Sequence, residues 1–206
     1  MPNFLKSVLL ALMLTGCANV NSDYALDASK TVGLAVGTIT YDSSVGLYNV
    51  SAVPSGRAYK QEEGRIFKVG DSMWHPFIRM YDDDLKARGG TFAVELPAGE
   101  YVLKRWFINQ GYITYAAKSD IGITFKVEPG KSVYLGNFHF DENSEVSLRD
   151  RAARDLPVLR KRFRAMEAAP LAFAISSDAN FDKIGGEYSR RMDSPAFVPF
   201  ALPAKK

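Results

Sequence analysis

The sequence predicts a mainly β protein, an antiparallel two-sheet β-sandwich followed by one amphipathic helix and an irregular tail. Three observations predict it: apolar side chains with a period of two before residue 140, turn signals between these runs, and helical spacing after residue 150. The period is clearest over residues 92–96 and 121–127, where apolar and polar side chains alternate. Such alternation is typical of antiparallel strands with one buried face.

The remaining strand candidates share a high content of β-branched and aromatic residues. They are residues 32–41, 47–53, 65–69, 101–110 and 133–140. Gly and Pro mark the turns between them, at Pro54-Ser55-Gly56, Arg88-Gly89-Gly90, Pro97-Ala98-Gly99 and Pro129-Gly130. About seven strands at this spacing favour a two-sheet sandwich over residues 32–148.

The segment 149–167 is predicted to be helical. One apolar face at spacings of four, three, four and three is formed by Ala152, Leu156, Leu159, Phe163 and Met166. Because Pro157 has no amide hydrogen, we expect it in the first turn of a helix that Asp155 caps and that ends near Met166. Residues 168–206 are rich in Pro and Gly, so we expect an irregular extension packed on the same domain, with one strand at 171–175.

Two segments carry a family resemblance. Residues 92–103 and residues 125–135 each read as a strand, a Pro- and Gly-containing turn, and a second strand. Both resemble hairpins of Ig-like and prealbumin-like (transthyretin-like) sandwiches, as in carboxypeptidase-regulatory-type domains and uncharacterised bacterial lipoproteins. The resemblance implies a fold, and it implies no catalytic residue, metal or cofactor.

The N-terminus contains a short apolar run, Ser7–Leu14, that follows Lys6 and leads into Leu14-Thr15-Gly16-Cys17. The run is too short for a stable transmembrane helix, which needs about 20 apolar residues. Cys17 is the only cysteine of the chain, so no intramolecular disulfide can form. A buried thiol and a reactive thiol are the alternative interpretations of a lone cysteine.

This pattern resembles the signal peptide and lipobox of bacterial lipoproteins. The resemblance implies cleavage between Gly16 and Cys17, removal of residues 1–16, and acylation of Cys17. The next residue is Ala18 rather than Asp, which in enterobacterial lipoproteins indicates the outer membrane, here facing the periplasm. The polar residues 17–31 then read as a lipidated tether with an r.m.s. reach of about 20 Å.

Composition argues against two classes of protein, disordered chains and nucleic-acid-binding proteins. The apolar fraction is 47% and the charged fraction 24%, which is typical of a globular domain. A net charge of +3 is too small to indicate a nucleic-acid partner. We therefore expect the membrane as one partner, through the lipid, and an envelope protein or a glycan as another.

Candidates for catalysis are few, because the only histidines are His75 and His139, and neither an H-E-x-x-H nor a G-x-S-x-G motif occurs. His139 lies near Asp141 and Glu142, which permits a metal or acid–base site. A histidine that bonds a backbone carbonyl is the favoured alternative. The run Asp82–Asp84 lacks the spacing of a calcium loop and is expected to be a solvated turn.

Two surfaces are candidates for binding. Basic residues of the predicted helix could contact an anionic partner, represented by Arg160, Lys161 and Arg164. Aromatic residues of a long hairpin could form a face for a glycan or lipid, represented by Trp106, Tyr112 and Tyr115. The alternatives are the solvated face of a docked helix and packing inside a sandwich.

These observations favour a non-enzymatic outer-membrane lipoprotein that acts as a binding or accessory module of the cell envelope. A glycan- or lipid-binding lipoprotein that uses the aromatic hairpin is the alternative. A hydrolase or metal-dependent enzyme that uses His139 ranks last.

Overall fold

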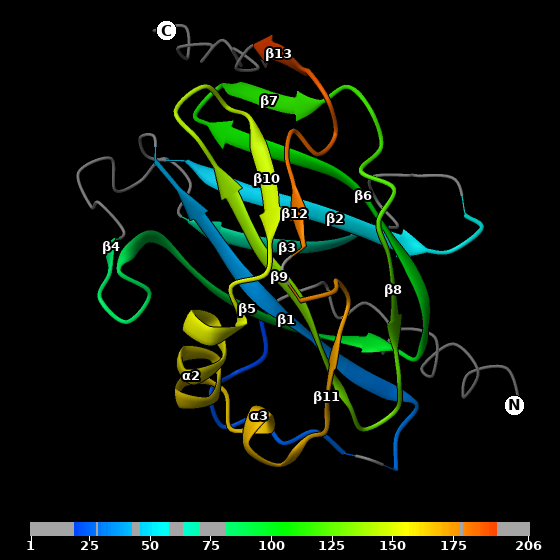
Figure 1. Cartoon of the computed structure of the whole chain (residues 1–206). Helices are drawn as coiled ribbons and strands as arrows, with labels where there is room; N and C mark the ends of the chain where they lie inside the picture. Colours follow the sequence, from blue (N-terminus) through cyan, green and yellow to red (C-terminus); the bar gives the residue numbers. More distant parts are fainter. Residues whose placement is uncertain are drawn as a thin grey trace, which may run out of the picture.

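The protein folds as two β-sheets packed face to face, with a short helical region on the outer face of one sheet (Figure 1). The computed structural model describes residues 19–27, 29–42, 46–57, 64–70, 81–177 and 179–192. Gly16, Cys17, Ala18 and His75 therefore lie outside the described residues. The mainly β class and the two-sheet sandwich are confirmed.

The described strands divide into two sheets. Sheet A has the order β12-β10-β9-β1-β5-β4, with β11 also paired to β9. Its strands are β1 (Val32–Tyr41), β4 (Tyr81–Asp82), β5 (Ala87–Pro97), β9 (Ser132–Phe140), β10 (Val146–Arg149), β11 (Leu171–Phe173) and β12 (Asn180–Phe181). Sheet B has the order β13-β7-β6-β2-β3, with β8 also paired to β6. Its strands are β2 (Leu47–Pro54), β3 (Arg65–Gly70), β6 (Gly99–Gln110), β7 (Ile113–Ala117), β8 (Thr124–Val127) and β13 (Tyr188–Met192).

Sheet A is mixed, so the prediction of an antiparallel sandwich is wrong for this sheet. Strand β1 pairs antiparallel with β5 but parallel with β9, and β11 also runs parallel to β9. Alternation in a sequence reports which side chains share a face, and it carries no information on the direction of the neighbouring strand. Strand β1 is buried along nearly its whole length, as expected for a strand covered on both faces.

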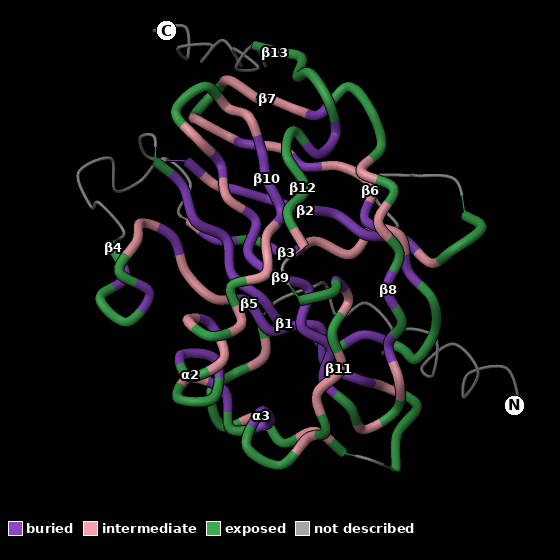
Figure 2. The backbone as a smooth tube through the Cα atoms, viewed as in Figure 1, coloured by how far each residue is buried: buried purple, intermediate pink, exposed green. Residues whose placement is uncertain are grey.

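The main core lies between the sheets, where Figure 2 shows the buried stretches concentrated in the central strands. Aromatic side chains fill much of it. The ring of Tyr48 stacks on Tyr41 with a centroid distance of 4.1 Å, and Phe67 stacks on Phe92 at 4.9 Å. Such pairs add to the free energy gained from burial itself, by about 0.5–1.5 kcal/mol each.

A second apolar cluster, here called the outer cluster, covers the lower part of the outer face of sheet A. It joins side chains of β1, β5 and β9 to the helices α2 (Ala152–Arg162) and α3 (Ala165–Ala168). Its buried members are Leu34, Val36, Ala93, Tyr134, Leu159, Phe163, Ala165 and Met166. The expected docking of the helical segment through Leu159 and Phe163 is confirmed.

The helix boundaries differ from the prediction. Helix α2 begins at Ala152 rather than at Asp155, contains Pro157 in its interior, and ends at Arg162. Asp155 is fully buried and bonds to sheet A, so its carboxylate cannot cap the helix. Pro157 deprives the carbonyl of Ala153 of its helical donor, and Ala153 is exposed, so water can bond that carbonyl instead.

Residues 19–27, here called the N-terminal strap, pack on the domain. The prediction of a flexible tether is wrong for this part of 17–31. Val20 donates its amide to the Ala93 carbonyl at 2.8 Å, so the strap covers the edge of β5. Val20, Tyr24 and Leu26 pack against the outer cluster. A polar sequence without a period gave no signal for this docking, which depends on three apolar side chains and an open strand edge.

The C-terminal extension is also more regular than predicted. Strand β11 lies within the expected strand 171–175, but β12 and β13 were expected to be irregular. Each is short, is made of exposed residues on both faces, and extends an existing sheet edge through backbone hydrogen bonds, so neither has an alternating pattern of burial. None of the helices in the described ranges has the length and apolarity needed to cross a bilayer.

Candidate functional site

A group of buried polar side chains lies on the outer face of sheet A, next to the outer cluster. Thr38 and Thr40 of β1 stand opposite Asn137 and His139 of β9 in the parallel register. Alternate residues of a strand share a face, so all four side chains project from the same side of the sheet. Thr38, Thr40 and Asn137 are almost completely buried.

A bulge in β9 produces this register. Val36 pairs with Tyr134, whereas Thr38 pairs with Asn137, so β9 has one extra residue at Gly136. Gly136 has a φ of +103°, and a Cβ there would come within 2.8 Å of Leu148. Only glycine suits both the conformation and the close approach, so this glycine sets which polar groups meet.

Asp155 of α2 is the charged centre of the site. Its Oδ2 accepts hydrogen bonds from the Tyr134 hydroxyl at 2.6 Å and the Thr38 hydroxyl at 2.7 Å. Its Oδ1 accepts a bond from Nε of Arg154 at 2.7 Å, which also neutralises the buried charge. Burial and the neighbouring carboxylate both raise the pKa of Tyr134, so its hydroxyl remains a proton donor.

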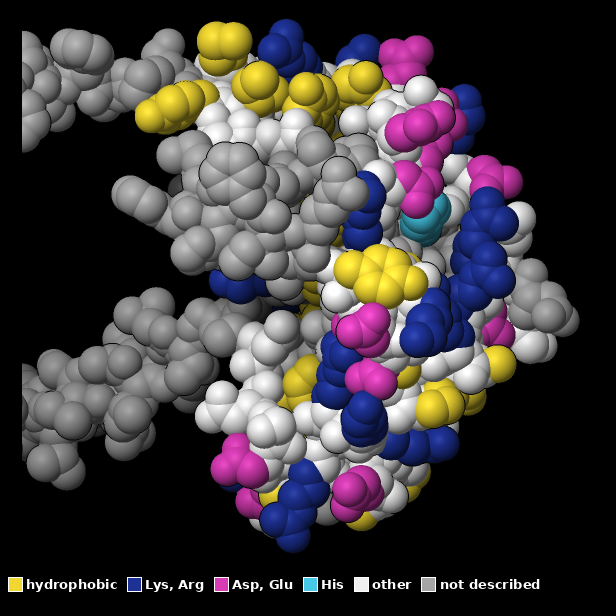
Figure 3. All heavy atoms as spheres, turned by 90° about the vertical axis from the view of Figure 1, so that its left-hand side faces the viewer, with side chains coloured by type: hydrophobic (Ala, Val, Ile, Leu, Met, Phe, Trp, Pro, Cys, Tyr) yellow, Lys and Arg dark blue, Asp and Glu magenta, His cyan; other side chains and the backbone are white. Residues whose placement is uncertain are grey.

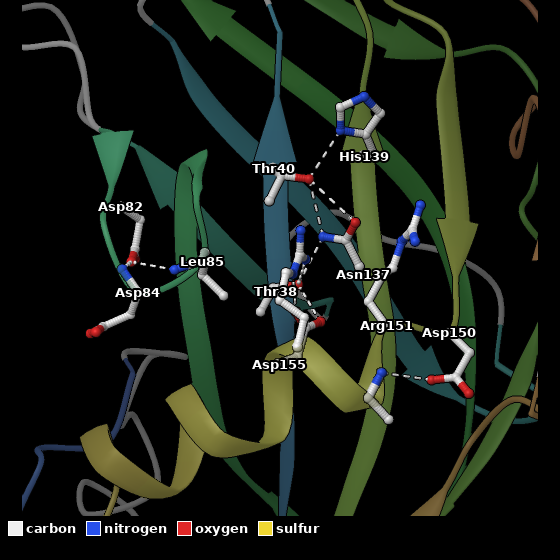
Figure 4. Close-up of polar contacts among 12 residues, drawn as sticks. Thr38, Thr40, Asp82, Asp84, Leu85, Asn137, His139, Asp150, Arg151 and Asp155 are labelled. Atoms are coloured by element: carbon white, nitrogen blue, oxygen red, sulfur yellow. Dashed lines mark hydrogen bonds and ion pairs between the residues drawn. The ribbon is translucent and has the colours of Figure 1, made fainter.

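A chain of hydrogen bonds leads from Asp155 to the surface (Figure 4). Asn137 donates from Nδ2 to the Thr38 hydroxyl at 2.8 Å and to the Thr40 hydroxyl at 3.1 Å. The Thr40 hydroxyl lies 3.0 Å from Nδ1 of His139. Nε2 of His139 then lies 3.2 Å from the carboxylate of Asp42, which is exposed to solvent.

The order Asp42, His139, Thr40 is that of a carboxylate, an imidazole and a hydroxyl in a hydrolytic triad. A nucleophile must be accessible to its substrate, and Thr40 is only 2% exposed. Its hydroxyl is also shared with the amide of Asn137. The geometry therefore suits a structural connection between α2 and the surface better than attack on a substrate.

The partners of His139 are not those expected from the sequence. Asp141 instead accepts bonds from the backbone amides of Asn143 and Glu145, which closes a turn. The expected bond to a backbone carbonyl is replaced by bonds to side chains. Asp42 was missed, because only the parallel pairing of β1 with β9 brings it close. Among the described residues, no group of His, Cys, Asp or Glu could hold a metal ion.

The acidic turn beside β4 is bonded to α2. Arg162 donates to both oxygens of Asp82 at 2.6 and 2.7 Å. Lys161 and Arg162 both bond Asp84, at 2.8 and 3.2 Å. The prediction of a solvated turn is therefore wrong for Asp82, which is buried, whereas Asp84 is exposed as expected and is also ion-paired. Burial raises the pKa of Asp82, but the hydrogen bonds and charge of Arg162, together with the backbone amides of Leu85 and Asp84, outweigh it and hold the pKa below its usual value.

This pairing changes the predicted anionic-partner surface. Lys161 is bonded to Asp84, whereas Arg160 and Arg164 are exposed and form no ion pair with the described residues. Acidic side chains lie beside a run of Lys and Arg side chains on this side of the molecule (Figure 3). Of the three predicted residues, Arg160 and Arg164 are therefore open to an anionic partner, whereas Lys161 is already paired with Asp84.

The predicted aromatic ligand face is also divided. Trp106 is fully buried, and its Nε1 donates to the carbonyl of Ile184 at 2.7 Å, so its assignment to a ligand face is wrong. Tyr112 lies in the turn between β6 and β7 and is 53% exposed. Tyr115 is half-buried and makes an edge contact with Tyr188 at 5.7 Å. The period of the strand places alternate aromatics inside the sandwich.

No family model, no curated protein and no solved structure matches this chain.

Proposed function

We propose that this protein is a lipid-anchored lipoprotein of the outer membrane that faces the periplasm and acts as a non-enzymatic binding or accessory module of the cell envelope. The observation that carries the proposal is the short apolar run that ends in Leu14-Thr15-Gly16-Cys17. Cys17 lies two residues before Asn19, the first residue that the structure describes, which already bonds to the domain. A leader followed directly by a folded domain is the arrangement expected of a cleaved and acylated precursor.

The polar groups of the candidate site support the non-enzymatic part of the proposal. The carboxylate of Asp155 has three donors, and the hydroxyl of Thr40 is buried and already bonded. Binding to another envelope component therefore falls to the surface rather than to a catalytic pocket.

The anchor is tested by mass spectrometry of the protein extracted from membranes. We expect an acylated Cys17 at the N-terminus and loss of residues 1–16, with the protein in the outer-membrane fraction. Cys17→Ser removes the acylated sulfur, and we expect uncleaved precursor or soluble protein. An unmodified Cys17 with the leader attached in the wild type would contradict the proposal.

The order Asp42, His139, Thr40 favours a hydrolase as the second candidate. Its test is His139→Gln, which keeps hydrogen-bonding capacity but cannot act as a base near neutral pH. In the accessory module, crosslinking of the intact lipoprotein in cells should capture the same partners from wild type and variant. Loss of the protein's cellular role in the variant, with unchanged partners, abundance and melting, would instead support the enzyme.

A further inference from the structure

The N-terminal strap is fixed at the residue where it enters the domain. The amide of Val20 bonds the carbonyl of Ala93 at 2.8 Å, and the amide of Ala93 bonds Oδ1 of Asn19 at 3.2 Å. Asn19 and Val20 thus occupy both hydrogen-bonding groups of one residue on the edge of β5. The chain is positioned from its first described residue onward.

Further contacts hold the rest of the strap. Ser22 accepts a bond from the amide of Arg164, which follows α2, at 2.9 Å. The hydroxyl of Tyr24 bonds the carboxylate of Glu95, and Val20, Tyr24 and Leu26 pack against the outer cluster. The strap therefore lies between the edge of β5 and the helical region, and both would have to be separated for it to leave.

Because the strap is docked, almost no free chain is left between Cys17 and the domain. Only Ala18 separates Cys17 from Asn19, and two residues of extended chain span at most about 7 Å. A free tether of residues 19–31 would instead reach about 20 Å and allow the domain to turn in any direction. The position of Asn19 therefore fixes which part of the domain stays next to an anchor at Cys17.

We propose that the docked strap holds the domain against the outer-membrane bilayer, with the β5 edge and the α2–α3 region nearer to the lipid than the β7–β13 end. This inference rests on the proposed function, because it requires an acylated Cys17. Figure 1 shows α2 and α3 at one end of the molecule and β7 and β13 at the other. The distal end, with the exposed Tyr112, is then presented to partners in the periplasm.

The short link between Cys17 and Asn19 sets the orientation, and attraction between basic side chains and the headgroups does not. Arg160 and Arg164 are exposed in the α2–α3 region, but so are Asp23, Asp27 and Glu167 nearby in the strap and α3. These opposite charges offset one another at the headgroups. We therefore expect the orientation to persist at about 0.5 M NaCl, where the Debye length falls to about 4 Å.

The test uses the full lipoprotein in vesicles of phosphatidylethanolamine and phosphatidylglycerol that contain a spin-labelled lipid. Arg164→Cys and Tyr112→Cys each provide one free thiol for a fluorescent label, since acylation blocks the sulfur of Cys17. We expect quenching to be several-fold stronger at position 164 than at position 112. Equal quenching at both positions, with acylation confirmed by mass spectrometry, would overturn the orientation and leave the lipoprotein assignment intact.

A matched pair of strap variants tests the cause. Val20→Asp places a carboxylate in the outer cluster and should release the strap, so the difference between the two positions should collapse. Asn21→Asp adds the same charge at an exposed neighbour and should preserve the difference. If Val20→Asp also preserved it, the docked strap would not be the cause. An unmodified Cys17 in the wild type would remove the anchor and overturn both proposals.

Discussion

The carboxylate of Asp155 should be the most sensitive polar group of the candidate site, and Asp155→Asn tests this. Asn has the same size, and its oxygen can still accept from Tyr134 and Thr38. Its amide group would then face Nε of Arg154, so two donors would oppose each other across what is now a 2.7 Å bond. The guanidinium of Arg154 would also lose its counter-ion.

The expected loss follows from burial. Removing one partner of a buried ion pair costs about 3–5 kcal/mol. Asp155 is fully buried, but the side chain of Arg154 is 31% exposed and can be partly hydrated. We therefore expect a loss at the lower limit, about 3 kcal/mol in the free energy of unfolding. For a domain of this size, that corresponds to a fall of about 6–12 °C in Tm.

Urea melts followed by tryptophan fluorescence measure this loss, since Trp106 lies in the core. The matched control is Asp83→Asn, because Asp83 is exposed and has no ion pair with the described residues, so its change should stay within about 0.5 kcal/mol. Tyr134→Phe should cost about 1–2 kcal/mol, since it removes one of the three donors. A loss below about 1 kcal/mol for Asp155→Asn would refute the reasoning that the buried carboxylate joins α2 to sheet A.

Three further changes test other parts of the structure. Asp82→Asn should cost about 2 kcal/mol at pH 7 in urea melts, because it breaks the paired bonds from Arg162. Folding lowers the pKa of Asp82, so the wild type should lose this advantage as the pH falls below about 4, and an equal difference between wild type and variant at pH 3 would contradict the reasoning. Phe163→Ala should cost about 3–5 kcal/mol in the same melts if the outer cluster packs as a core, and a cost below about 1 kcal/mol would mean an undocked helix. Trp106→Phe keeps an aromatic ring but leaves the carbonyl of Ile184 without the indole donor, so amide hydrogen exchange near residue 184 should accelerate. Unchanged exchange would show that this hydrogen bond does not hold the C-terminal extension.

The sequence was sufficient to predict those features that depend on local periodicity. Alternating side chains located β5, and the residues of the apolar helix face, such as Leu159 and Phe163, are buried where the spacing placed them. These predictions succeed because burial on one face imposes a period on any strand or helix. The same logic cannot identify the neighbour of a strand, which is why the parallel pairing of β1 with β9 was missed.

The candidate site depends on such long-range pairing. Thr38, Thr40 and Asn137 have no special spacing in the sequence, and they meet only because the bulge at Gly136 sets the register of two parallel strands. Asp155 has the sequence signature of a helix cap, but a fully satisfied site inside the fold is available to its carboxylate. The opposite charges of the Asp82–Asp84 run and the basic helix gave the one signal that could have predicted a contact.

The outer face of sheet A explains why the N-terminal strap and helix α2, far apart in the sequence, pack on the same surface. Its lower half carries Leu34, Val36 and Tyr134, which would be exposed on an isolated sandwich. Helix α2 covers part of this area, and the strap covers the adjoining edge of β5, so neither segment alone completes the outer cluster. Burial of shared apolar surface makes the docking of the two segments mutually supportive. A partner that weakened the packing of α2 would therefore also weaken the docking of the strap, and a force applied to the strap at the membrane would destabilise the packing of α2.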